Sequence, residues 1–189
     1  MAVPDDDFDS DDNFAHLGTD GLEIDDEAGG EALLWQLLLL INPDDEEAAL
    51  QQFSAWREAM ADAAEVEPDP LAALARVIDW KSGFDVGAHD TGALIESLDE
   101  LASRWNLRID WGVDDPTDPD FLAAADGGSL LARAHDQLRE HGYTLWTWNP
   151  RGAVREDVFM GWITWRHDGE GLQAVAQALD IEVRPGNVH

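Results

Sequence analysis

Cysteine is absent from the 189 residues of this chain. Without a thiol, the chain has no disulfide bond, no thiolate zinc site and no cysteine nucleophile. The sequence also lacks the phosphate-binding patterns G-x-x-x-x-G-K-[ST] and G-x-G-x-x-G, and the G-x-S-x-G turn of serine hydrolases. Because none of these patterns is present, we predict that the protein is not an enzyme and uses no cofactor.

Basic residues are scarce: 11 Lys and Arg stand against 41 Asp and Glu, for a formal net charge of −30. Lys81 is the only lysine, and the first 56 residues contain 16 acids and no base. A field of this sign repels nucleic acids and anionic membranes and attracts basic proteins. We therefore expect a basic protein partner and no direct binding to nucleic acid or membrane. Acidity that serves only solubility or adaptation to high salt is the alternative.

Long hydrophobic runs are also missing. The most apolar segment, 32–41, is about ten residues long, whereas a membrane-spanning helix needs roughly 18 or more. The first 14 residues lack the basic start and the apolar run of a signal peptide. Together with the absence of cysteine, these features favour a cytoplasmic protein.

The chain does contain enough apolar material for a core, with 44% hydrophobic residues and nine Trp. Residues 1–27 hold 11 acids, no base and few apolar groups, which predicts a disordered acidic tail. Residues 28–189 carry the remaining charge of −19. They are predicted to form a single globular α+β domain, with a helical part at 28–105 and a sheet part at 106–189.

Apolar periodicity predicts helices throughout the first part of the domain. Residues 31–41 are apolar nearly all round, as expected of a buried helix. Asn42-Pro43 and Asp69-Pro70 each combine a capping side chain with proline at the first helical position. The further predicted helices are 43–63, 70–78 and 90–105, with a loop at 82–87.

The second part is predicted to contain a sheet. Residues 107–111 alternate between apolar and charged side chains, which predicts a strand, and further strands are predicted at 143–148, 158–165 and 181–184. Helices capped by Asp118 and Ser129, and a helix after Asp168, separate these strands. The resulting order over residues 107–185, β-αα-β-β-α-β, is ferredoxin-like, with a four-stranded, mostly antiparallel sheet.

Both faces of the two central strands are apolar. In 143–148, Leu145 and Trp146 are neighbours and therefore point to opposite faces, and 158–165 has the same character. A sheet of this kind needs a cover on each side. We expect the helical part, 28–105, to form an N-terminal layer on the second face, and we expect most Trp residues to belong to the core.

Three segments together resemble a known family: IDWKSGF (78–84), IDWG (109–112), and HGYTLWTW (141–148) followed by GWI (161–163). Over roughly residues 30–185 the chain is similar to an uncharacterised bacterial family, one of the domains of unknown function. The resemblance implies a bacterial source and assigns no activity or functional residue. The hairpin loop, 149–157, is longer and more basic than expected of the family. A looser resemblance, in charge and architecture, is to acidic ferredoxin-like ribonuclease inhibitors.

Candidate metal ligands are few. His135 and His141 are six residues apart on one predicted helix, so they do not share a face, and no H-E-x-x-H pattern is present. Both are interpreted as surface or helix-end histidines. We predict no metal site.

The candidate partner-binding residues are acidic clusters near helix starts and two arginines in the hairpin loop. The acids are Asp44, Asp45, Glu46, Glu47, Asp114, Asp115, Asp118 and Asp120. The arginines, Arg151 and Arg155, are candidates for binding an anion or the acidic tail, and two solvated loop charges are the alternative. Charge complementarity of this kind accelerates association with a basic protein.

These features favour an acidic cytoplasmic binding or inhibitor protein, and specifically a bacterial immunity protein that neutralises a toxin. One alternative is a nucleic-acid mimic, whose carboxylates would occupy a DNA-binding enzyme. The others are an enzyme of unrecognised type and a housekeeping domain. Monomer and homodimer both stay open.

Overall fold

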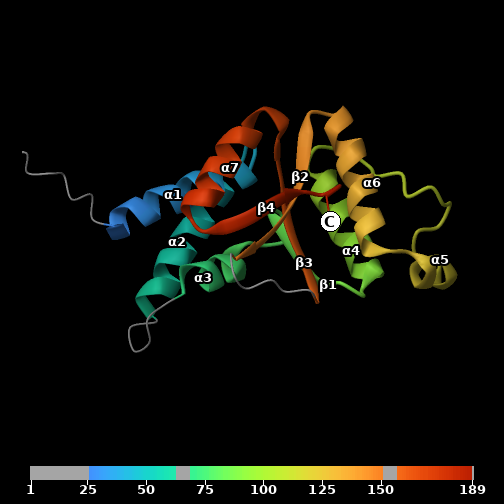
Figure 1. Cartoon of the computed structure of the whole chain (residues 1–189), viewed down its shortest axis with the longest axis horizontal. Helices are drawn as coiled ribbons and strands as arrows, with labels where there is room; N and C mark the ends of the chain where they lie inside the picture. The colour runs from blue at the N-terminus through green and yellow to red at the C-terminus, as the bar shows by residue number, and fades with distance from the viewer. Residues whose placement is uncertain (1–25, 63–68, 151–156, 189) are drawn as a thin grey trace, which may run out of the picture.

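The structure, a computed structural model, describes residues 26–62, 69–150 and 157–188. These residues form an α+β domain, as predicted (Figure 1). The helices are α1 (Asp26–Ile41), α2 (Glu46–Asp62), α3 (Pro70–Val77), α4 (Thr91–Ser103), α5 (Pro119–Ala124), α6 (Gly127–Glu140), the short 3-10 helix η1 (Arg166–Asp168) and α7 (Gly169–Ala178). The strands are β1 (Gly83–Gly87), β2 (Tyr143–Pro150), β3 (Val158–Trp165) and β4 (Ile181–Pro185).

The four strands form one antiparallel sheet in the order β1-β3-β2-β4. β2 and β3 are the two central strands, and their register pairs Trp146 with Trp162 and Tyr143 with Trp165. β4 pairs with β2 at one edge, and β1 pairs with β3 at the other. The predicted four-stranded sheet and three of its strands are thereby confirmed.

The remaining strand was predicted wrongly. β1 is formed by residues 83–87, which were predicted to be a loop, and residues 107–111 form no strand. The two glycines of β1 lower its intrinsic strand propensity, which pairing with β3 overrides. In 107–111, the side chain of Gln137 takes the place of a neighbouring strand. The amide of Asp110 donates to Gln137 Oε1 at 2.8 Å, and Gln137 Nε2 donates to the Asp110 carbonyl at 2.9 Å.

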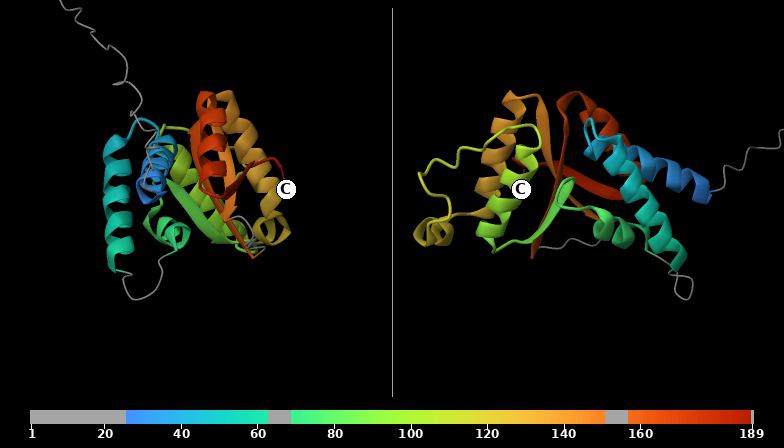
Figure 2. Two further views of the ribbon diagram at one scale, coloured as in Figure 1. Left: turned by 60° about the vertical axis from the view of Figure 1, so that its left-hand side comes forward. Right: turned by 180° about the vertical axis from the view of Figure 1, so that it is seen from behind.

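Two crossover connections join strands that flank a third strand. β1 leads through α4, α5 and α6 to β2, and β3 leads through α7 to β4. Both crossovers move in the same direction across the sheet, but they leave from antiparallel strands. Crossovers of one hand therefore place their helices on opposite faces. α4 and α6 cover one face, and α7 covers the other together with α1, α2 and α3 (Figures 1 and 2).

This layering differs from the predicted one in two respects. In a ferredoxin-like arrangement both crossover helices share a face, whereas here α7 lies opposite α4 and α6. In addition, α4 belongs to the segment 28–105, which was predicted to cover the second face as a whole, but it packs beside α6. The prediction that both faces of the sheet are covered is confirmed.

Each face carries its own core cluster. The first packs Trp146, Trp148 and Trp162 against α1, α2, α3 and α7, and the rings of Trp148 and Trp162 stack with centroids 5.0 Å apart. The second packs Leu145 and Ile163 against α4 and α6. As predicted, most of the Trp side chains lie in these two clusters or pack against them.

Local helix signals were partly predictive. The carboxylates of Asp69 and Asp118 accept hydrogen bonds from backbone amides in the first turns of α3 and α5, as predicted. The predicted cap of α6 is wrong, because Asp126 has this role and accepts from the Ser129 amide at 2.9 Å. Asp and Ser are both good capping residues. Asp126 comes first along the chain and caps the helix, so Ser129 lies within the first turn of α6.

Asn42 was also predicted wrongly as a helix cap. Asp45 caps α2, since its Oδ1 accepts from the Ala48 amide at 3.0 Å. Asn42 is only 2% exposed and turns inward, where its Nδ2 donates to the Leu38 carbonyl and to Gln52 Oε1, both at 2.9 Å. Asn42 therefore joins the end of α1 to α2 through buried hydrogen bonds.

Two predicted features fall outside the described residues. These are the acidic tail up to residue 25 and the two hairpin-loop arginines, Arg151 and Arg155. α1 already begins at Asp26, within the last residues of the predicted tail. Across 26–62, 69–150 and 157–188, every helix is too short or too polar to span a membrane.

Candidate functional site

A groove of about 970 Å³ runs between α4 and the segment that follows it, residues 107–117. Its floor is apolar and includes Ile95, Ile109 and Trp111, which are 4%, 8% and 5% exposed. Carboxylates line it, from Glu96, Asp99, Glu100, Asp110 and Asp114. Arg108 is the one basic residue among the described residues of the lining. The groove is therefore strongly negative above an apolar base.

The helix side of the groove follows from the spacing of residues along α4. Glu96, Asp99 and Glu100 are at positions i, i+3 and i+4, so they project from one side of the helix. The opposite stripe of α4 is apolar and buried against the sheet, including Leu94 and Leu98. An amphipathic helix packed on a sheet thus presents its carboxylates away from the core.

The loop side is held by side chains of α6. Arg133 Nε donates to the carbonyl of Asp110, and its guanidinium is 3.8 Å from the Asp110 carboxylate. Gln137 bonds the backbone of Asp110 as described above. Gly112 has a φ of +78°, and a Cβ there would lie 2.7 Å from the Arg133 guanidinium. The chain can turn this closely over Arg133 because a glycine occupies this position.

Asp99 connects the two sides of the groove. The indole Nε1 of Trp111 donates to the two carboxylate oxygens of Asp99 at 3.2 and 3.1 Å. Partial burial raises the pKa of Asp99 above its ordinary value, while the bond from Trp111 and the charge of Arg108 act in the opposite direction. The carboxylate thus ties the loop to α4 and contributes negative charge to the groove.

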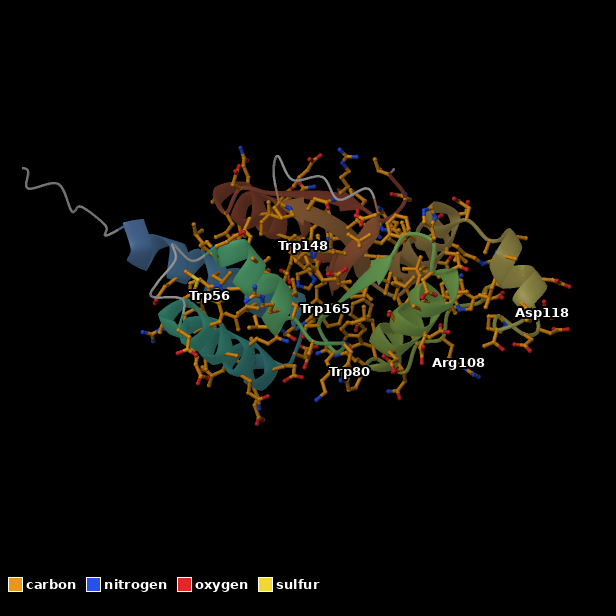
Figure 3. All side chains as sticks on the ribbon, turned by 90° about the horizontal axis from the view of Figure 1, so that it is seen from below. Trp56, Trp80, Arg108, Asp118, Trp148 and Trp165 are labelled. Carbon is orange, nitrogen blue, oxygen red and sulfur yellow. The ribbon has the colours of Figure 1, made fainter. Side chains whose placement is uncertain are left out.

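The predicted acidic residues are distributed over two regions of the structure. Asp114 lines the groove, and Asp115 follows it directly and accepts hydrogen bonds from Thr117, which lower the pKa of Asp115. Asp118 and Asp120 begin α5, at one end of the molecule, where Figure 3 labels Asp118. Asp118 is engaged as a helix cap, while Asp120 is an exposed residue of the first turn.

The other predicted cluster does not reach the groove. Asp44 and Asp45 lie in the turn between α1 and α2, and Glu46 and Glu47 form the first turn of α2. The carboxylate of Asp45 is 3.5 Å from the guanidinium of Arg104, whose side chain is 13% exposed. This ion pair has a structural role, because Arg104 also donates to the carbonyl of Lys81.

Sequence reasoning missed four of the five carboxylates of the groove, namely Glu96, Asp99, Glu100 and Asp110. The i, i+3, i+4 spacing on α4 was a usable signal for three of them. The fold of residues 107–117 over that face had no local signal. A segment predicted to be a strand offers no reason to look for a groove beside it.

His135 and His141, the two candidate metal ligands, lie in different surroundings. His135 was interpreted as a surface or helix-end residue, but it is 0% exposed, and its Nδ1 lies 3.0 Å from the Leu145 carbonyl. His141 is exposed at the end of α6. In the described parts of the chain, no group of three or more His, Asp or Glu side chains is placed to hold a metal ion.

Comparisons with known proteins agree with the resemblance seen in the sequence. A family model described as a domain of unknown function (DUF6630) matches residues 33–186. No curated protein matches the chain, and no solved structure matches it.

Proposed function

The chain belongs to DUF6630, a family of domains of unknown function, and we propose that it is a binding protein whose acidic groove takes a basic segment of a partner protein. The observation that carries this proposal is the lining of the groove between α4 and residues 107–117: five carboxylates and one guanidinium. A segment with several Lys or Arg residues complements this charge.

The apolar floor supports binding of side chains with long stems. Lys and Arg bury their methylene stems on apolar surface while their charged groups stay at the rim. Trp111 and Ile109 form part of such a floor, and Val113, at 40% exposure, adds apolar surface within the groove. Tryptophan is enriched among the residues that dominate binding energy at interfaces.

The net charge of −30 supports the same function over longer distances. Its field accelerates the encounter with a basic protein and makes the association rate sensitive to salt. The partner class that we propose is a basic protein such as a toxin, which the domain neutralises in the cytoplasm as an immunity protein. A DNA-binding enzyme, held by carboxylates in place of phosphates, is the second candidate.

The groove is tested with a hexa-arginine peptide, whose binding is measured by calorimetry at low and at physiological salt. The test variant combines Glu96→Gln, Glu100→Gln and Asp114→Asn. We expect it to lose affinity by about threefold to a hundredfold, because each exposed ion pair contributes about 0.2–1 kcal/mol. Asp99 is left intact because it anchors Trp111.

The matched control removes the same charge elsewhere, with Asp136→Asn, Glu140→Gln and Glu170→Gln on exposed positions of α6 and α7. This control has the same net charge as the test variant. We expect it to bind the peptide within about twofold of the unmodified protein. Equal losses in both triple variants would show general charge attraction and would contradict a groove-based function.

The partner class is tested separately, with a photo-crosslinking residue in place of Val113 in the source cell. A toxin or another basic protein captured at the groove supports the proposal, and a DNA-binding enzyme supports the second candidate. Absence of any crosslinked protein in the cell, while the purified protein still binds the peptide, would refute a protein partner at this site.

A further inference from the structure

A second groove, of about 370 Å³, lies between the helices α1 and α2 on their solvent-facing side. It is lined by Glu31, Ala32, Trp35, Leu50 and Phe53. None of these residues also lines the acidic groove. The pair α1 and α2 lies at one end of the molecule and α5 at the other, so the two grooves occupy separate parts of the surface (Figure 1).

The spacing of apolar residues on both helices creates this groove. Along α1, Ala32, Trp35 and Leu39 are at positions i, i+3 and i+7, so they follow one another on one side of the helix. Along α2, Leu50 and Phe53 are at positions i and i+3. The rings of Trp35 and Phe53 meet between the helices, with centroids 5.4 Å apart. We call these five residues the α1–α2 strip.

The α1–α2 strip leaves large aliphatic side chains in solvent. Leu39 is 37% exposed and Leu50 is 55% exposed. By contrast, three other leucines of α1 are at most 1% exposed, namely Leu34, Leu37 and Leu38. Apolar side chains that are exposed together, unlike scattered single ones, mark interaction surfaces. The strip is therefore a surface for a partner to cover.

The dimensions of the α1–α2 strip match two turns of a helix. Leu39 follows Ala32 by seven residues, which corresponds to about 10.5 Å along the helix axis. A partner helix with apolar residues at i, i+3 or i+4 and i+7 presents a row of the same length. Because α1 and α2 pack side by side, the ridge of such a helix fits along the valley between them.

Carboxylates border the α1–α2 strip. Three of them are exposed on α2, from Glu46, Glu47 and Glu58. On α1, the carboxylate of Glu31 is 3.6 Å from the guanidinium of Arg57, the one basic residue in the sequence of 26–62. The same segment contains nine acids. Lysine and arginine residues beside the apolar row of a partner helix are therefore complementary to this border.

Charge also decides between the possible occupants of the α1–α2 strip. A second copy of the chain would bring another net charge of −30, and repulsion between such surfaces opposes their association. Residues 1–25 of the same chain contain nine acids and no base, so their charge has the wrong sign as well. A basic helix of a different protein is the occupant whose apolar row and charge both fit.

We propose that the α1–α2 strip binds an amphipathic helix of another protein, with apolar residues at i, i+3 or i+4 and i+7 and with Lys or Arg beside them. The apolar row covers Leu39 and Leu50, and the basic side chains lie towards the carboxylates of α2. This inference goes beyond the function proposed for the acidic groove and does not rest on it, because the two surfaces share no residue.

The probe is a synthetic peptide of leucine, alanine and lysine, about 15 residues long, whose leucines form one face of a helix. Binding at the strip is followed by NMR, through the backbone amides of Ala32 and Leu50. We expect saturable shifts at both amides. A peptide of the same composition in scrambled order, and one with glutamate in place of lysine, are expected to give no saturable shift there. An equal response to either of these peptides overturns the proposal.

Two variants remove apolar side chains from the strip. We expect Leu39→Ser and Leu50→Ser each to weaken peptide binding by about three- to tenfold, because each leucine loses the burial that the peptide provides. The matched control Val188→Ser changes an apolar residue that is 51% exposed near the C-terminus and is expected to leave binding unchanged. Thermal unfolding checks that each variant is folded. Folded Leu39→Ser and Leu50→Ser proteins that bind as tightly as the control would overturn the proposal.

The role of charge is tested by combining Glu46→Gln with Glu58→Gln, which is expected to weaken peptide binding by about two- to tenfold. The control combines Asp136→Asn with Glu140→Gln on α6, and it changes the net charge equally. Equal losses in the two double variants would show general charge attraction and would overturn the proposal. The triple variant of the acidic groove is expected to keep binding at the strip within about twofold, which separates this inference from the proposed function.

The occupant in the source cell is identified with a photo-crosslinking residue in place of Leu50, and mass spectrometry maps the crosslinked segment. A segment of another protein with the stated apolar spacing and a net positive charge supports the proposal. A crosslink to a second copy, to residues 1–25 of the same chain or to a segment without this pattern overturns it. Absence of any crosslink, while the purified protein still binds the peptide, overturns it as well.

Discussion

The side-chain amide of Gln52 donates a hydrogen bond to Ser82 Oγ at 2.7 Å, which joins α2 to the turn before β1 across 30 residues of sequence. Gln52 Oε1 accepts from Asn42 at 2.9 Å, and Ser82 donates to Asn42 Oδ1 at 2.5 Å. The three side chains close a ring of hydrogen bonds and are 2%, 5% and 1% exposed for Asn42, Gln52 and Ser82. Buried polar groups satisfied in this way specify how neighbouring elements meet.

Replacing Gln52 by Ala is expected to destabilise the domain by about 1–3 kcal/mol, because Asn42 and Ser82 each lose a buried partner. The neighbouring Gln51 is the control: it is exposed, and its amide donates only to Glu47 at 3.4 Å. We expect Gln51→Ala to change the free energy of unfolding by less than about 0.5 kcal/mol. Urea denaturation of both variants measures the difference, and equal stabilities would contradict a structural role of the ring.

Gly161 on β3 is expected to reject any side chain. A Cβ there would lie 2.4 Å from Cζ of Phe84 and 2.5 Å from the backbone carbonyl of Trp146. Gly161→Ala should therefore destabilise the sheet by about 1–3 kcal/mol, as other overpacked positions do. In contrast, Gly171 on α7 has open space, and Gly171→Ala should stabilise by up to about 1 kcal/mol. Thermal unfolding tests both, and a neutral Gly161→Ala would refute the predicted clash.

Buried His135 is expected to make stability depend on pH. Burial lowers the pKa of His135 below its ordinary value of 6.5, so the unfolded chain binds this proton more readily than the folded one. Neutral His135 therefore contributes its full stability above about pH 6.5, and this stability is lost as the pH falls towards the pKa of the folded state. Chemical denaturation between about pH 5 and 8 measures this slope.

The variant His135→Asn keeps a donor for the Leu145 carbonyl but does not titrate. We expect it to remove this part of the pH dependence, whatever its effect on stability at neutral pH. The control His141→Asn alters an exposed histidine of the same helix and should retain the slope. A slope that persists in His135→Asn would assign the effect to other groups.

Trp111→Phe is expected to raise the pKa of Asp99 further. The indole bonds at 3.2 and 3.1 Å favour the ionised carboxylate, and they oppose the upward shift that burial causes. Phenylalanine keeps an aromatic ring on the groove floor but donates no hydrogen bond. Carbon-13 NMR titration of the Asp99 carboxyl measures the change, with Trp80→Phe as the control. An unchanged or lower pKa would contradict the assigned role of Trp111.

Helix starts were predictable where the cause is local. Asp69 and Asp118 each precede a proline and cap the helix that follows, because the carboxylate reaches amides two and three residues ahead. At Asn42 the same local pattern misled, since Gln52 and Ser82, ten and 40 residues away, offer that side chain better partners. A capping prediction holds only when no distant group competes for the side chain.

The strands show the same division. Residues 143–148 and 158–165 were predictable because both are dense in β-branched and aromatic residues. β1, with the sequence GFDVG, was not predictable, because pairing with β3 and not its own propensity makes it a strand. Residues 107–111 alternate in the same manner as a strand, yet the Gln137 side chain satisfies the backbone there.

The sequence by itself determined the net negative charge, which is a sum over the composition. It also determined the apolar periodicity of the helices and the two apolar faces of the central hairpin, because these patterns are properties of residues within a few positions of one another. The tertiary structure alone decided which segment completes the sheet, which face each helix covers, and that Glu96 and Asp114 line one groove while Trp35 and Phe53 line another. These outcomes depend on contacts between segments tens of residues apart. The free energy of such contacts comes from pairing and burial in the folded domain, which no local pattern encodes.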